Sequence, residues 1–187
     1  MLRTRLPAVL RLIISLCALA FLAGSGAVAA AAPGESAALT VSGDVKTPLS
    51  LSLDDLKKMP HETLVVVNPH TKKVEIYEGV PLAALLQAAG VPHGEELRGA
   101  AMTGYVMAAA RDHYRVAFSL AELDPAYLDS GVIVADTLDG QPLPADLGPL
   151  RLVAPHEKRP ARWIRMLESL TVVIPAKAAA AEKPAPK

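Results

Sequence analysis

The segment Gly148-Pro149-Leu150-Arg151-Leu152-Val153-Ala154-Pro155 places an apolar run around one arginine, and Arg162-Trp163-Ile164-Arg165 follows it in the same 187-residue chain. The apolar run predicts a buried strand over 150–154 that ends at the proline. Upstream, Val132–Ala135 predicts a second buried strand, and Asp139-Gly140 predicts a tight turn after it. Downstream, 170–174 predicts a closing strand, whereas 161–167 fits either a helix or a strand. The last third of the chain is therefore predicted to build a sheet.

The first half of the chain combines short strands with two helices. Strands are predicted where apolar residues alternate or cluster, over 39–45, 64–67 and 73–77. The turn Asn68-Pro69-His70-Thr71 joins the last two strands as a hairpin. Ser52 with Asp55 predicts the start of a short helix, and Pro81 predicts the start of a longer helix that Gly90 ends.

The middle of the chain continues this pattern. Residues 98–110 are small and apolar, Arg111-Asp112-His113 predicts a turn, and 114–118 alternates as a strand. Ser119 with Glu122 three places later predicts a second capping box and a short helix. Because strands and short helices do not alternate regularly, the sequence predicts an α+β fold with mixed, layered β-sheets and no doubly wound parallel sheet.

The N-terminus has the three parts of an export signal. Arginines precede an apolar run over 12–22, and small residues follow it. Cleavage is predicted after Ala29 or Ala32, which in both cases removes Cys17, the only cysteine of the chain. A lipoprotein anchored at Cys17 is one alternative, although Leu16 stands where a small residue is needed. A retained membrane anchor is the other, although the run is short for a spanning helix. We expect a periplasmic or secreted protein.

The rest of the chain corresponds to one domain. We predict a signal peptide over 1–32, a linker over 33–38, a single domain over 39–174 and a disordered tail rich in Ala, Lys and Pro over 175–187. Without the three arginines of the signal and the three lysines and one glutamate of the tail, 13 basic and 18 acidic residues remain. This acidic balance argues against a nucleic-acid binder, which needs a positive footprint.

Several short motifs occur in a fixed order between residues 43 and 173. They are Gly43-Asp44-Val45, Leu49-Ser50-Leu51-Ser52-Leu53-Asp54-Asp55-Leu56, Tyr77-Glu78-Gly79-Val80-Pro81-Leu82, Val134-Ala135-Asp136, Asp139-Gly140-Gln141-Pro142-Leu143 and the two segments quoted first. Each motif alone is common, but together they resemble the molybdopterin-binding domain of sulfite-oxidase-type enzymes and its small bacterial periplasmic relatives. The resemblance implies the sulfite-oxidase-type fold of layered sheets and, in the full-size enzymes, a molybdenum cofactor buried between loops.

The same resemblance implies a metal-binding cysteine shortly before the Gly79-Val80-Pro81-Leu82 motif. Here that stretch reads Val65-Val66-Val67-Asn68-Pro69-His70 and offers no sulfur. A neutral imidazole or amide does not reproduce the charge that a thiolate donates to a metal. His70 is a candidate substitute ligand, and the alternative is an exposed turn residue. We therefore assign no catalytic residue and no metal ligand, and expect no cysteine ligation of a metal in the cleaved chain.

Basic residues gather between Arg151 and Arg165, where only Glu157 opposes them. The resemblance implies that basic residues of this segment help to bind the phosphate of the pterin, and the planar fork of arginine pairs with two phosphate oxygens at once. The candidate cofactor-binding residues are Arg151, His156, Lys158, Arg159 and Arg162. The alternative is that Arg162 and Arg165 form the solvated side of an amphipathic segment.

The remaining histidines and large aromatic residues receive structural interpretations. His61, His93 and His113 lack the spacing of a zinc site. His113 beside Asp112 predicts a solvated turn, and the alternative is an acid–base pair. Tyr114 and Trp163 are predicted to anchor the core, and the alternative is that a pterin or haem partner stacks on them.

Three functions stay open. The first is an exported, non-catalytic family member that binds a small anionic ligand, with molybdopterin as the candidate, or a partner protein. The second is a molybdenum-cofactor-dependent periplasmic oxidoreductase subunit with an unusual ligand set, working with a haem, redox or membrane partner. The third is a fold kept for protein contact alone. The missing thiol and the retained basic segment favour the first function.

Overall fold

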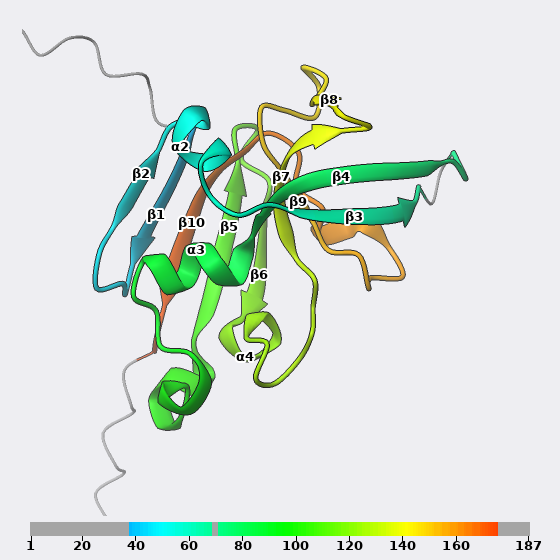
Figure 1. Ribbon diagram of the computed structural model, residues 1–187. Coiled ribbons are helices and arrows are strands. Elements are labelled where there is room, and N and C mark those ends of the chain that lie inside the picture. Colours follow the sequence, from blue (N-terminus) through cyan, green and yellow to red (C-terminus); the bar gives the residue numbers. More distant parts are fainter. Residues whose placement is uncertain (1–37, 69–70, 176–187) are drawn as a thin grey trace, which may run out of the picture. The chain divides into compact units, whose positions relative to one another are not determined.

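The computed structural model describes residues 38–68 and 71–175, which form two five-stranded sheets and a few short helices (Figure 1). The elements in chain order are β1 (Leu39–Gly43), β2 (Leu49–Leu51), α2 (Leu53–Lys57), β3 (Glu62–Val67), β4 (Val74–Pro81), α3 (Leu82–Ala88), η1 (Gly94–Glu96), η2 (Gly99–Thr103), β5 (Tyr105–Ala110), β6 (Arg115–Ser119), α4 (Leu120–Leu123), β7 (Ile133–Leu138), β8 (Gln141–Pro142), β9 (Arg151–Val153), η3 (Pro160–Arg162) and β10 (Leu167–Val173). The predicted α+β class with mixed sheets is confirmed.

The first sheet has the strand order β2-β1-β10-β5-β6. The strands β1 and β10 run parallel, with Thr40 opposite Ser169, and the other neighbours are antiparallel. In β5, buried and half-buried residues alternate strictly, which is the period of a strand with one face on a core. The last strand of the chain thus lies in the middle of this sheet, between the first strand and β5.

The second sheet has the order β3-β4-β7-β8, and β9 also pairs with β7. The strands β3 and β4 form the predicted hairpin, with Leu64 opposite Tyr77 and Val66 opposite Glu75. Figure 1 shows this hairpin extending well beyond the neighbouring strands. Among the described strands, β3 pairs only with β4, so β3 is an edge strand.

The helices start where local capping chemistry predicts. Ser52 and Asp55 form both halves of a capping box at α2. Proline 81 precedes α3, and Gly90 lies just past its end with a φ of 73°. At α4, the Ser119 side chain accepts a hydrogen bond from the Glu122 backbone. None of the helices in the described residues is long and apolar enough to cross a membrane.

Two apolar clusters hold the sheets. The larger cluster lies between the sheets, because it combines Val41 and Leu170 of the first sheet with Val134 and Leu152 of the second. The smaller cluster lies on the other face of the second sheet and contains the fully buried Tyr77. Trp163 packs against both clusters, in line with its predicted role in the core.

The structure corrects the prediction for Tyr114 and resolves the ambiguity over residues 161–167. Tyr114 is not a core residue: it is 49% exposed and lines a surface cavity, where its hydroxyl donates to the Ala161 carbonyl. The ambiguous stretch 161–167 is the end of η3, a bend and the first residue of β10. The predicted signal peptide, nearly all of the linker and tail, and the candidate ligand His70 lie outside the described residues.

Candidate functional site

Arg151 of β9 lies against two aromatic rings. Its guanidinium carbon is 5.3 Å from the ring centre of Tyr77 and 5.5 Å from that of Trp163. The two rings stand edge to face, with their centres 6.2 Å apart and their planes at 89°. Stacking on aromatic faces is a favourable setting for an arginine because the ring faces are electron-rich. The rings thus hold the guanidinium in place without neutralising its charge.

A chain of hydrogen bonds orients this arginine. Its Nη1 donates to the Tyr77 hydroxyl over 2.6 Å, and that hydroxyl donates to Glu75 over 2.9 Å. Asn68 in turn donates to the other Glu75 oxygen over 2.6 Å. Burial, with a further contribution from Glu75, raises the pKa of Tyr77 to about 12, although the charge of Arg151 acts in the opposite direction. The tyrosine therefore stays a neutral donor at physiological pH.

One atom of Arg151 is left without a partner. Its Nε is buried and makes no hydrogen bond, and no carboxylate of the described residues forms an ion pair with the side chain. Arg151 lines a cavity of about 280 Å³ together with Asp112, Tyr114, Trp163 and Arg165. Arg165 faces Asp112 at 3.9 Å, which is the limit of an ion pair. An arginine that lines a cavity and has no carboxylate partner is suited to bind an anion there.

Arg162 is in the opposite situation. Its Nε donates to Glu157 over 2.5 Å and its Nη1 donates to Glu122 over 2.7 Å. The same Nη1 donates to the Ala117 carbonyl, and the guanidinium lies 4.2 Å from the ring centre of Phe118. Burial lowers the pKa of Arg162, but the two glutamates outweigh burial and the net shift is upward. Its charge is compensated within the protein.

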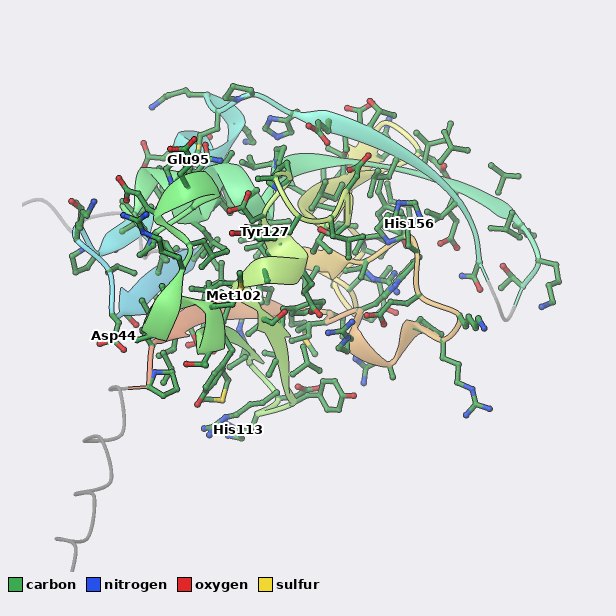
Figure 2. All side chains as sticks on the ribbon, turned by 90° about the horizontal axis from the view of Figure 1, so that it is seen from below. Asp44, Glu95, Met102, His113, Tyr127 and His156 are labelled. Carbon is green, nitrogen blue, oxygen red and sulfur yellow. The ribbon has the colours of Figure 1, made fainter. Side chains whose placement is uncertain are left out.

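The structure separates the five predicted ligand residues. Arg151 lines the cavity just described. His156 and Lys158 line a second cavity of about 350 Å³ between the end of β3 and residues 155–163, and Figure 2 shows His156 on this side of the domain. Arg162 lines a third cavity of about 430 Å³, which His156 also borders. Arg159 is exposed and lines none of these cavities.

Trp163 connects the first two cavities. It lines both, and its indole Nε1 donates to the Ala154 carbonyl over 2.7 Å. The centre of the candidate site is therefore Arg151, which keeps its charge and has an Nε without a hydrogen-bond partner. Trp163 and Tyr77 contact its guanidinium. The ligand-binding role of the five residues remains a prediction.

The candidate site residues from the sequence did not include Tyr77 or Glu75. Both lie on β4 two residues apart, and side chains at i and i+2 share one face of a strand. This spacing is the only hint in the sequence, because their partner Arg151 follows 74 residues after Tyr77.

The histidines do not assemble a metal site. His61 lies 3.0 Å from Asp136 and 2.8 Å from the Met59 carbonyl, a pairing that the sequence did not reveal. His113 is exposed in the turn between β5 and β6, and Figure 2 shows it well away from His156. Within 38–68 and 71–175, no three His, Cys, Asp or Glu side chains form a group that could hold a metal ion.

The stretch where the resemblance implies a metal-binding cysteine begins at the end of β3. There Val65 and Val67 are exposed, Val66 is buried, and Asn68 is bound to Glu75. The described residues contain no cysteine, because the only cysteine of the chain is Cys17.

Comparisons with known proteins agree with this architecture. The sequence matches the family described as oxidoreductase molybdopterin binding domain over residues 26–179. No curated protein sequence matches the chain. Among solved structures, the sulfane dehydrogenase SoxCD from Paracoccus pantotrophus is similar, with a TM-score of 0.57 and 22% identity over 72% of this chain. The match covers only 37% of that protein and shows a shared fold. The chain belongs to the oxidoreductase molybdopterin binding domain family.

Proposed function

We propose that this protein is an exported, non-catalytic member of its family that binds an anionic ligand, with molybdopterin as the candidate, through Arg151. The observation that carries the proposal is that Arg151 lines a cavity of about 280 Å³ and forms no ion pair with a carboxylate of the described residues. An arginine without an ionic partner gains free energy when it forms charge-assisted hydrogen bonds to an anion.

The charges around the cavity support an anionic ligand. Arg151 and Arg165 contribute two positive charges, against one negative charge from Asp112. Because Asp112 and Arg165 are only marginally paired, an incoming phosphate can compete for Arg165. Trp163 and Tyr114 supply aromatic surface beside these charges, as a planar heterocycle requires.

The residues present fit one part of the cofactor better than the other. Molybdopterin supplies an anionic phosphate and, when loaded, a molybdenum centre for redox chemistry. Arg151 suits the phosphate, whereas the end of β3 provides aliphatic side chains where the family provides a thiolate. If the chain is cleaved after Ala29 or Ala32, no cysteine is left to hold a metal. This combination favours ligand binding over oxidoreductase activity.

The test is the cofactor content of the purified full chain, produced in a bacterial host that makes molybdopterin. Molybdenum is measured by elemental analysis, and pterin is measured by fluorescence after oxidative release. We expect pterin without stoichiometric molybdenum. We also expect Arg151→Gln to lower the pterin content at least roughly tenfold, because a charge-assisted hydrogen-bonding group is lost.

The matched control is Arg98→Gln, which removes the same charge from an exposed position that lines none of the three cavities and should leave the pterin content unchanged. Stoichiometric molybdenum together with pterin would overturn the non-catalytic reading. Absence of pterin from the wild-type protein would remove molybdopterin as the ligand and leave a protein partner as the function to test.

A further inference from the structure

One face of the β3–β4 hairpin is apolar and uncovered. Its exposed side chains are Val65, Val67, Val74 and Ile76, which are 67%, 60%, 61% and 39% exposed. The register places Val65 opposite Ile76 and Val67 opposite Val74, so the four side chains form one contiguous patch across both strands. We name it the hairpin patch.

The hairpin patch is the continuation of a buried face. Residues 74, 76, 78 and 80 of β4 point to the same side because side chains alternate along a strand. Val80 on this side is buried in the main cluster between the sheets. Figure 1 shows that the hairpin then runs out past the other elements, so the same face loses its cover toward the hairpin turn. A cluster of aliphatic side chains left open in this way marks an interaction surface.

The charges at the two ends of the hairpin patch identify a partner. Glu78 lies on the same face at the inner end, two residues beyond Ile76, and Lys72 lies two residues before Val74 at the outer end. Neither side chain forms an ion pair with a described residue. Along its length, the hairpin patch therefore has a negative charge at the inner end, apolar side chains in the middle and a positive charge at the outer end. A surface with this order is complementary to itself when reversed.

We propose that the hairpin patch binds the hairpin patch of a second copy of this chain about a twofold axis, with the strands of the two copies antiparallel. The axis passes at the level of Val66 and Glu75, which is the centre of the patch. Rotation about it places each Lys72 over the Glu78 of the other copy and stacks the aliphatic side chains between them. Such an isologous contact closes on itself and yields a dimer, not a fibre.

The size of the hairpin patch sets the strength of this dimer. Four aliphatic side chains per copy bury a few hundred Å² on each side, which is on the small side for a specific interface. We expect a reversible dimer with a dissociation constant on the order of 100 μM.

The test is sedimentation velocity of the purified full chain over a concentration series. We expect a concentration-dependent shift from monomer to dimer. Val65→Lys combined with Ile76→Lys should weaken dimerisation by roughly tenfold or more, because charges are placed in the centre of the contact. Leu128→Lys is the matched control, since Leu128 is 54% exposed on another part of the domain. It should leave the dimer unchanged.

A charge exchange tests the arrangement. Lys72→Glu and Glu78→Lys should each weaken the dimer, because each places like charges over one another. The double variant should restore wild-type affinity. A monomer at every concentration, a dimer that tolerates lysines at 65 and 76, or no recovery in the double variant would each overturn the proposal. Circular dichroism verifies the fold of every variant.

Discussion

Arg162 illustrates, at the scale of the residue, that a charge in the sequence need not be a charge available to a ligand. Two carboxylates from separate parts of the chain, Glu122 and Glu157, bind its guanidinium. Arg151 has no such partner and keeps its charge beside a cavity. The two arginines lie 11 positions apart in one basic segment and differ only in their surroundings.

Replacing Arg162 tests this pairing. Arg162→Met removes three hydrogen bonds and leaves Glu122 and Glu157 facing each other without a cation. We expect the free energy of unfolding to fall by about 1–2 kcal/mol, a modest amount because the group is partly exposed and solvent screens it. Urea denaturation at neutral pH measures the change.

A double-mutant comparison with Glu122→Gln tests the same pair. This change should destabilise the wild type but not the Arg162→Met variant. Arg165→Met, at an exposed and loosely paired arginine, should change stability by less than about 0.5 kcal/mol. Equal effects of the two arginine replacements would contradict the assignment.

His61 predicts a pH dependence. One ring nitrogen faces the Met59 carbonyl and the other faces the Asp136 carboxylate, and both partners are acceptors. Only the imidazolium can donate to both. Burial lowers the pKa of His61, but these bonds and the charges of Asp136 and Glu78 outweigh it, so the pKa lies above the ordinary value of 6.5.

Because the pKa is raised by folding, the contribution of His61 to stability is complete below about pH 6.5 and is lost as the pH rises through the raised value. We expect urea midpoints of the wild type and of His61→Gln to differ more at pH 5.5–6 than at about pH 8. The difference between the two proteins isolates His61 from the other histidines. A difference that grows with pH would show that the neutral form is the stabilising one.

Gly79 shows, at the scale of the element, why the motif before α3 requires a glycine. The pairing of β4 with β7 is irregular between Glu78 and Gly79, and Asp136 is the extra residue on β7. A β-carbon on Gly79 would collide with the Val134 carbonyl oxygen and the Ala135 Cα. Both are backbone atoms of the neighbouring strand, which cannot turn away as a side chain can.

We therefore expect Gly79→Ala to lower the free energy of unfolding by roughly 2–4 kcal/mol. Gly140→Asn is the control, because Gly140 has open space around it and asparagine tolerates its φ of 73°. Thermal and urea unfolding of both variants measure the change in the free energy of unfolding. An alanine at 79 that is tolerated as well as asparagine at 140 would show that the strands can separate without cost.

Capping boxes mark the limit of sequence-based prediction within an element. Ser52 and Asp55 satisfy each other as predicted, because both partners lie within one helical turn. At α4, Ser119 accepts its bond as predicted, but the Glu122 side chain binds Arg162, 40 residues away. The hydrogen bond between Ser119 and the Glu122 backbone could be predicted from the sequence. The bond between the Glu122 side chain and Arg162 could not, because Arg162 is distant in the sequence.

At the scale of the whole molecule, the sequence predicted the kinds of element and the α+β class better than the site. Alternation and turn residues act locally, so the hairpins and the strands around Val134 and Leu152 were predictable. The site depends on pairs such as Arg151 with Tyr77, which only the sheet order brings together. Tyr114 failed as a core residue for the same reason, since its neighbours across the cavity come from η3.

The parallel pairing of β1 with β10 determines how the domain bears mechanical force. Both strands run in the same direction, with Thr40 opposite Ser169 and Gly43 opposite Val172. Tension applied at the start of β1 and at the end of β10 pulls the two strands past each other along their length. All hydrogen bonds between them are then loaded together, instead of opening one after another. A domain pulled from both ends would therefore resist unfolding strongly, because the hydrogen bonds between β1 and β10 must break together in shear.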